Sequence, residues 1–273
     1  MLSTVALATR PEFTITAVTC RDEHRGWSSP EVRADYRLVL VRRGRFRRSA
    51  MGSPAVVDPT AAYLGVPGEE ERFAHPSGGD ECTSVTLTPA LWRVMAGEGA
   101  RPTRPSVYVD AKLDLAHRRV LAAGRARDVD FALTETLLHL LAAGVDQVVT
   151  GPTPTGGLDR ALVAAARDLI NDGDPASDGL LPLAERLEVS PYRLSRAFSR
   201  EVGVSLTRYR NRVRVGRALD RIEDGDRQLA VLAADLGFAD QAHLCRTVRE
   251  HVGHTPTALR RLLGRDTAST VDA

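Results

Sequence analysis

The chain has 273 residues, which is enough for two ordinary domains, and its net charge of +2 is close to neutral. With 43% hydrophobic and 26% charged residues the composition is that of a globular protein, and no apolar run approaches the ~20 residues of a membrane span. Three cysteines form no disulfide framework and the first residues lack a signal-peptide pattern, so the sequence predicts a cytoplasmic protein that is not attached to a membrane.

The first third of the chain has the pattern of antiparallel β-structure. Residues 10–90 alternate short runs rich in Val, Thr, Tyr and Phe with turn residues. Regularly spaced turns of this kind indicate a sandwich or a small barrel. The prediction is a β-barrel sensor domain at 1–98, followed by a loop over 96–106.

Helical periodicity follows in a segment at 107–149, with helices expected at about 110–123 and 130–144. An apolar stripe of leucines runs along the second helix, at Leu133, Leu137, Leu138, Leu140 and Leu141. Such a stripe suits dimerisation, and it suits sealing the β domain equally well.

Two of the three cysteines lie close to histidines in the β domain. The candidate set is Cys20, His24, His75 and Cys82. Two cysteines and two histidines can hold zinc or another thiophilic metal, or serve as a redox-sensing site. The turn sequence PSGGD predicts that His75 and Cys82 face each other across a hairpin. The alternative is that both cysteines are small core residues and both histidines lie on loops.

The β domain also contains aromatic residues that suit either a small-molecule pocket or the core, namely Trp27, Tyr36, Phe46 and Tyr63. Catalysis is not expected. No H-x-H metal motif occurs, and three cysteines cannot build the four-cysteine zinc cluster of alkyl-repair proteins.

A proline- and glycine-rich stretch at 150–157 is the predicted linker to an all-helical domain at 158–265, and 266–273 is the predicted tail. The helical domain contains a degenerate repeat. Leu183, Ala184 and Leu187 recur 49 residues later, whereas Ser190, Leu194, Arg196 and Gly203 recur 50 residues later, at Asp240, Leu244, Arg246 and Gly253. Each copy predicts a short helix, a turn and a capped longer helix, which is a helix-turn-helix.

The second helix of each copy is the expected recognition helix, at 190–202 and 240–252. Residues expected to meet base edges are Tyr192, Arg193, Ser195, Arg196 and Arg200 in the first helix and Gln241, His243 and Arg246 in the second. Arginine suits guanine and glutamine suits adenine. For His243, a packing or phosphate-contacting role is an equal alternative.

Basic charge is concentrated on the first expected recognition helix and the start of the helix that follows it. Residues 190–217 contain eight arginines and one acid, a net charge of +7. A phosphate backbone is attracted to such a stretch. The candidates for phosphate contacts are Arg210, Arg212 and Arg249. A single long helix is expected over about 205–223, and it would set the spacing of the two recognition helices.

The segments LAERLEVSPYRLSRAFSREVGVSLTRY and LAADLGFADQAHLCRTVREHVGHTP resemble the paired helix-turn-helix domain of the AraC/XylS transcription regulators. The most specific marks are GF-x-D-Q and the G-x-TP of Gly253, Thr255 and Pro256, and the resemblance covers about 158–263. Val248 and Ala242 depart from the usual pattern. The resemblance implies an effector-sensing barrel of cupin type in front, possible homodimers, and contact with RNA polymerase.

The sequence therefore predicts an α+β protein that is a regulator of transcription, an activator among the possibilities, with double-stranded DNA as its partner. Its effector is a small molecule or a metal. A first alternative keeps the DNA-binding domain and makes the front domain a metal or thiol switch. A second alternative is a non-specific nucleic-acid binder with an adaptor barrel.

Overall fold

The computed structural model describes residues 2–21, 24–103, 106–126, 132–150 and 157–263. By its internal contacts the chain divides into two units, one of Met1–Val109 with Ala116–Thr153 and one of Asp110–Leu115 with Pro154–Ala273. The predicted tail and nearly all of the predicted linker fall outside the described residues. No helix of the described part is both long and apolar enough to cross a membrane.

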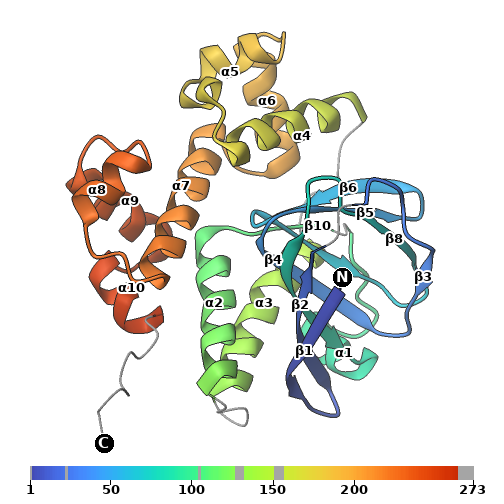
Figure 1. Cartoon of the computed structure of the whole chain (residues 1–273). Helices are drawn as coiled ribbons and strands as arrows, with labels where there is room; N and C mark the ends of the chain where they lie inside the picture. Colours follow the sequence, from blue (N-terminus) through green and yellow to red (C-terminus); the bar gives the residue numbers. More distant parts are fainter. Residues whose placement is uncertain (1, 22–23, 104–105, 127–131, 151–156, 264–273) are drawn as a thin grey trace, which may run out of the picture. The chain divides into compact units, whose positions relative to one another are not determined.

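Two antiparallel sheets build the N-terminal unit (Figure 1). The six-stranded sheet has the order β1-β2-β9-β4-β7-β10. Its strands are β1 (Leu2–Thr9), β2 (Phe13–Cys20), β9 (Asp80–Leu87), β4 (Tyr36–Arg43), β7 (Ala61–Gly65) and β10 (Ser106–Tyr108). The four-stranded sheet has the order β3-β8-β5-β6, with β3 (Glu31–Val32), β8 (Glu70–Ala74), β5 (Phe46–Ala50) and β6 (Ser53–Val57).

The space between the two sheets is an apolar core. Val39, Val41 and Tyr63 come from the six-stranded sheet and meet Phe46 and Val57 of the four-stranded sheet. Alternation of side chains along each strand places these residues on the inner faces. Phe46 and Tyr63 therefore belong to the core, which is one of the two roles that the sequence allowed.

Helices cover the outer face of the six-stranded sheet. They are α1 (Pro89–Ala96), α2 (Ala111–Ala126) and α3 (Thr134–Thr150). Leu141, Val145 and Val148 of α3 lie against Leu38 and Leu64 of the sheet. Four of the five leucines in the predicted stripe are fully buried, whereas Leu138 is 41% exposed. The stripe thus packs within the chain.

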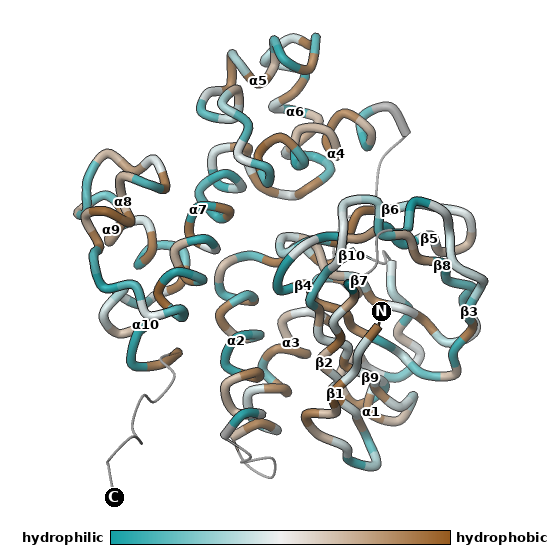
Figure 2. Tube along the Cα trace, viewed as in Figure 1, coloured by the Kyte–Doolittle hydropathy of each residue, from teal (hydrophilic) through white to brown (hydrophobic). Residues whose placement is uncertain are grey.

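The C-terminal unit is helical (Figure 1). Its elements are α4 (Gly157–Asp172), the short η2 (Pro175–Asp178), α5 (Leu180–Arg186), α6 (Pro191–Val202), α7 (Leu206–Glu223), α8 (Leu229–Asp235), α9 (Gln241–Val252) and α10 (Pro256–Leu263). Hydrophilic and hydrophobic residues alternate along α7 (Figure 2), and its buried positions contact α6, α9 and α10. The predicted fold class is confirmed: an antiparallel β domain, then helices, then two helix-turn-helix motifs joined by a long helix.

Four described elements of the N-terminal unit were not predicted, namely β1, β3, α1 and β10. The predicted hairpin across PSGGD is wrong. The strand before it, β8, pairs with β3 and β5, whereas the strand after it, β9, pairs with β2 and β4. The turn therefore carries the chain from one sheet to the other.

Candidate DNA-binding surface

The helix α6, the first of the two predicted recognition helices, begins and ends as its sequence dictates. The hydroxyl of Ser190 accepts a hydrogen bond from the backbone N–H of Arg193 at 3.2 Å, and Pro191 occupies the first turn, where its missing N–H costs nothing. Gly203 ends the helix with φ of 83°, a left-handed conformation that favours glycine. Leu194 and Phe198 are fully buried, so the opposite side of α6 faces solvent.

The helix α9, the second predicted recognition helix, has the same kind of start and end. The carboxylate of Asp240 accepts from the N–H of His243 at 2.6 Å, and Gly253 ends the helix with φ of 78°. Leu244 and Val248 are fully buried, as Leu194 and Phe198 are in the first copy. The two helices therefore bury and expose equivalent positions over most of their length.

The exposed side of α6 carries Tyr192, Arg193, Arg196 and Arg200, with Ser195 half-buried. Arg196 donates from Nη1 to the Tyr192 hydroxyl at 2.7 Å, and its guanidinium carbon lies 5.5 Å from the centre of the tyrosine ring. These contacts restrict a long side chain at the surface, which lowers the entropy lost on binding a ligand.

On α9, Gln241 and Arg246 are exposed and His243 is half-buried. The His243 Nδ1 accepts a hydrogen bond from the Ala239 N–H at 3.3 Å, and the ring meets Phe238 edge to face. These contacts support the packing role for His243. Arg246 occupies the position equivalent to Arg196, and both side chains are exposed.

An acidic residue that the sequence reasoning missed lies beside α6. Asp159 of α4 forms an ion pair with Arg200 and lies 4.0 Å from Arg193. Glu201 pairs with Arg160 of the same helix at 3.4 Å. A carboxylate near the start of the predicted helical domain gave no signal of this role, since the contact depends on how α4 packs against α6.

The three phosphate-contact candidates differ in their surroundings. Arg249 is exposed. Arg210 lies 3.0 Å from Asp178, an exposed acid that also pairs with Arg214 at 3.1 Å. Arg212 is 2% exposed and lies 3.2 Å from Asp114, so it is buried in an ion pair. A buried guanidinium does not suit contact with a phosphate, and we no longer assign that role to Arg212.

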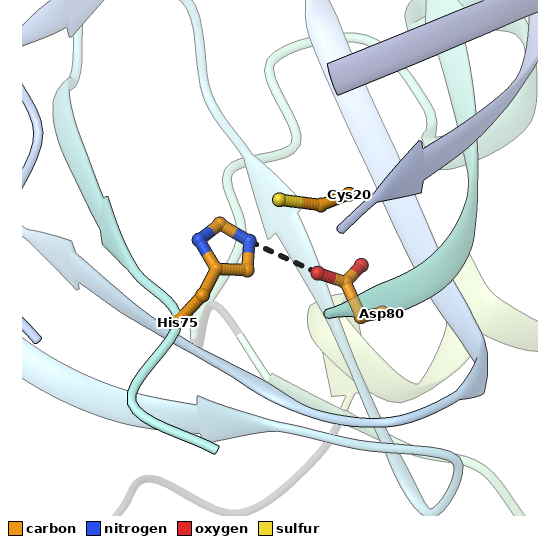
Figure 3. Close-up of side chains that lie close together, drawn as sticks. All are labelled: Cys20, His75 and Asp80. Atoms are coloured by element: carbon orange, nitrogen blue, oxygen red, sulfur yellow. Dashed lines mark ion pairs between the residues drawn. The ribbon is translucent and has the colours of Figure 1, made fainter. Parts of the chain in front are cut away.

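The candidate metal residues of the N-terminal unit lie close together. The rings of His24 and His75 are hydrogen-bonded, with 2.9 Å between Nε2 of His24 and Nδ1 of His75. Cys20 stands opposite Asp80 in the register of β2 and β9, and Asp80 lies 2.9 Å from His75 (Figure 3). Cys82 packs at the edge of the core between the sheets. Asp80 does not belong to the set predicted from the sequence, which contains only cysteines and histidines.

The remaining aromatic candidates have structural partners. Tyr36 stacks on Trp92 at 4.3 Å between ring centres, and Trp92 donates from Nε1 to the carbonyl of Ala100. Trp27 is exposed and carries the guanidinium of Arg47 over its ring at 5.0 Å.

Comparison with known proteins finds relatives of the helical unit. Residues 183–262 match the model of a helix-turn-helix domain, which spans both motifs. Over 122 residues, 44% of this chain, the sequence is 27% identical to the regulatory protein PocR of Salmonella typhimurium. Over 128 residues, 46% of this chain, it is 28% identical to the transcriptional activator RhrA of Rhizobium meliloti. These matches support a regulator of the AraC/XylS type, and they rest on the helical unit.

The matches to PocR and RhrA span 39% of the length of each relative. Among solved structures, the C-terminal domain of AraT, a response regulator from Geobacillus stearothermophilus, is 25% identical over 41% of this chain and 93% of that domain, with a TM-score of 0.38. ToxT from Vibrio cholerae is 10% identical over 95% of this chain and all of its own, also with a TM-score of 0.38. Scores at this level describe a loose likeness and assign no ligand.

Proposed function

We propose that the C-terminal unit reads a specific double-stranded DNA site through α6 and α9, and that an effector bound by the N-terminal unit regulates this reading. The observation that carries the DNA proposal is the equivalence of Arg196 and Arg246. Both are exposed, both stand six residues after the helix cap, and both lie on a helix whose opposite face is fully buried.

The side chains on these faces suit base edges. A guanidinium can donate two parallel hydrogen bonds to O6 and N7 of guanine, and a glutamine amide can pair with N6 and N7 of adenine. Arg196 and Arg246 are the candidates for guanine, and Gln241 is the candidate for adenine. Tyr192 contributes by holding Arg196 through its hydroxyl.

The connecting helix supports simultaneous reading by both motifs. With 18 residues, α7 is about 27 Å long, which is comparable with the ~34 Å between successive major grooves on one face of DNA. Its core positions pack against both motifs, so the two recognition helices belong to one body. With a flexible connection, the two helices would bind DNA independently of each other.

The experiment is a selection of bound sequences from random DNA, with the wild type and three variants. Arg196→Ala should lose base preference at one part of the site and Arg246→Ala at another, each by ~1–3 kcal/mol at the affected positions. Arg93→Ala, which removes the same charge from the exposed side of α1, is the matched control and should leave preferences unchanged.

A result in which the wild type selects no sequence would favour the alternative of a non-specific nucleic-acid binder. Uniform weakening by both variants, with base preferences intact, would also contradict the assignment, because it is the signature of phosphate contacts.

Homodimerisation and contact with RNA polymerase remain proposals that come from the family resemblance. For a dimer, the predicted leucine stripe is a poor candidate, since four of its five leucines are buried within the chain. Sedimentation of the full chain with and without DNA measures the oligomeric state directly.

A further inference from the structure

A cluster of polar side chains lies where the two sheets of the N-terminal unit meet. Cys20 ends β2 and Asp80 begins β9, both in the six-stranded sheet, and they face each other in register. His75 directly follows β8 of the four-stranded sheet. One potential ligand atom from each of these three residues lies within 4.8 Å of the other two, and the side chains converge (Figure 3).

Hydrogen bonding fixes the protons of the two histidines. The His24 Nδ1 lies 3.1 Å from the carbonyl oxygen of Gly26, which can only accept, so Nδ1 donates. In a neutral His24 the Nε2 then accepts, and its partner at 2.9 Å is the Nδ1–H of His75. The Nε2 of a neutral His75 is therefore left with a lone pair.

A second hydrogen-bond acceptor, a carboxylate oxygen, lies next to this nitrogen. The Oδ1 of Asp80 lies 2.9 Å from His75 Nε2, and its side chain is 2% exposed. Among the described residues, no hydrogen bond of acceptable geometry reaches this oxygen. Two acceptors this close repel each other unless a proton or a metal ion lies near both, and a buried oxygen atom without a hydrogen bond is costly. An ion about 2.0–2.1 Å from both atoms would lie off the line that joins them, with an N–metal–O angle of ~90°.

We propose that Cys20, His75 and Asp80 bind one thiophilic divalent metal ion of the zinc class. Thiolate sulfur, imidazole nitrogen and carboxylate oxygen are the donors that zinc takes in proteins, and a thiolate and a carboxylate balance its two charges. Ligand atoms around tetrahedral zinc lie roughly 3.3–3.8 Å apart, so on binding the widest separations, of up to 4.8 Å, must shorten by about 1 Å, and the 2.9 Å contact between His75 and Asp80 must lengthen slightly.

The site differs from the set that the sequence suggested. Asp80 is a ligand, whereas His24 holds the ligand His75 through its other ring nitrogen, an arrangement common around zinc. Cys82 lies two residues after Asp80 on the same face of β9, but it is not one of the three residues whose ligand atoms converge.

A thiol switch fits the same residues less well. Burial raises the pKa of both Cys20 and Cys82, and the charge of Asp80 raises it further, which disfavours the reactive thiolate in the empty site. Because Cys20 stands opposite Asp80, it is a diagonal neighbour of Cys82, with a separation of about 7–8 Å between Cα atoms. That exceeds the usual span of a disulfide.

Since His75 follows a strand of one sheet while Cys20 and Asp80 belong to the other, the ion would link the two sheets. Metal binding should therefore stabilise the N-terminal unit, because a ligand that binds only the folded state raises the midpoint of unfolding. The inference concerns this site alone and does not depend on the DNA-reading proposal.

The test uses the full chain, stripped of metal by a chelator and titrated with Co²⁺ and then Zn²⁺. The wild type should bind one equivalent, show the sulfur-to-cobalt charge-transfer band of a thiolate ligand, and melt at least ~5 °C higher with Zn²⁺. Cys20→Ser should abolish the charge-transfer band. Asp80→Asn and His75→Ala should no longer bind one equivalent of the metal ion. Cys245→Ser, in α9, is the matched control and should bind as the wild type does.

His24→Ala gives a graded readout that a folding defect would not mimic. Loss of the residue that orients a ligand should weaken metal binding by ~10–100-fold while leaving one equivalent bound at saturation. Circular dichroism checks that each variant is folded. The proposal is overturned if the folded wild type binds no Co²⁺ or Zn²⁺, or if Cys20→Ser and His75→Ala bind as tightly as the wild type. DNA binding, measured on the same samples, reports on the other proposal separately.

Discussion

Replacing Asp159 by asparagine should increase the affinity of the chain for DNA. In the structure Asp159 forms an ion pair with Arg200 and lies 4.0 Å from Arg193, and both arginine side chains are more than half exposed on α6. Each arginine must give up this carboxylate before it can bind a phosphate or a base. The carboxylate also repels the phosphate backbone.

The size of the effect follows from the exposure of the pairs. Exposed ion pairs contribute about 0.2–1 kcal/mol each because water screens them. Releasing two such contacts should improve binding by about 0.5–1.5 kcal/mol, a ~2- to 10-fold gain in affinity. The gain should shrink as salt rises, because screening weakens both the pairs and the phosphate attraction.

Fluorescence anisotropy with a labelled duplex, at several salt concentrations, measures this gain. Glu70→Gln is the matched control, since it removes one acid paired with an exposed arginine in the N-terminal unit. The gain should also vanish in a chain that carries Arg193→Ala and Arg200→Ala. Unchanged or lower affinity in folded Asp159→Asn, or an equal gain in the arginine-free background, would refute the reasoning.

Substitutions at three positions test the architecture of the helical unit by urea unfolding. Gly203→Ala should lower the free energy of unfolding by about 1 kcal/mol. No atom lies close to the added Cβ, so the only strain comes from the left-handed φ of 83°. Gly216→Ala should cost more, about 3 kcal/mol, since its Cβ would lie 2.5 Å from Arg212 Nη1 and disturb a buried ion pair. Asp240→Ala should cost about 1 kcal/mol, and Asp240→Ser should restore most of it. A smaller loss for Gly216→Ala than for Gly203→Ala would show that the buried pair is not held rigidly.

The helical unit was predictable because its signals are local. A cap such as Ser190, a glycine such as Gly203 and apolar residues four apart lie within one helix, and the repeat supplies each signal twice. The β domain offered fewer such signals. Its first strand, β1, was missed because its outer positions are largely exposed, and it is held mainly by pairing with β2.

The candidate sites depended on partners that are distant in the sequence. Arg212 has the same local pattern as its exposed neighbours, and only Asp114, far earlier in the chain, explains its burial. Asp80 could have been noticed, since it lies two residues before Cys82 in a turn that already contained His75. The chain of contacts from Gly26 through His24 to His75 had no sequence signature, because it depends on how two loops meet.

The arginines between 190 and 217 should attract DNA less strongly than their number suggests. Five of the eight lie within 4.0 Å of an acid, namely Arg193, Arg200, Arg210, Arg212 and Arg214. Counting Asp114, Asp159 and Asp178 with Glu201, the local net charge falls from +7 to +4.

Each phosphate neutralised contributes about −0.9 to the slope of log K against log salt. The net charge of +7 from the sequence alone therefore predicts that this stretch contributes about −6 to the slope. The net charge of +4, which counts the paired acids, predicts a contribution of about −4. To isolate this share, the slope of the wild type is compared with that of a chain in which the unburied arginines of the stretch are changed to glutamine. A difference near 6 would mean that the acids move away when DNA binds. A difference near 4 would mean that the carboxylates stay in place and limit non-specific binding, leaving base contacts at Arg196 and Arg246 to set the choice of site.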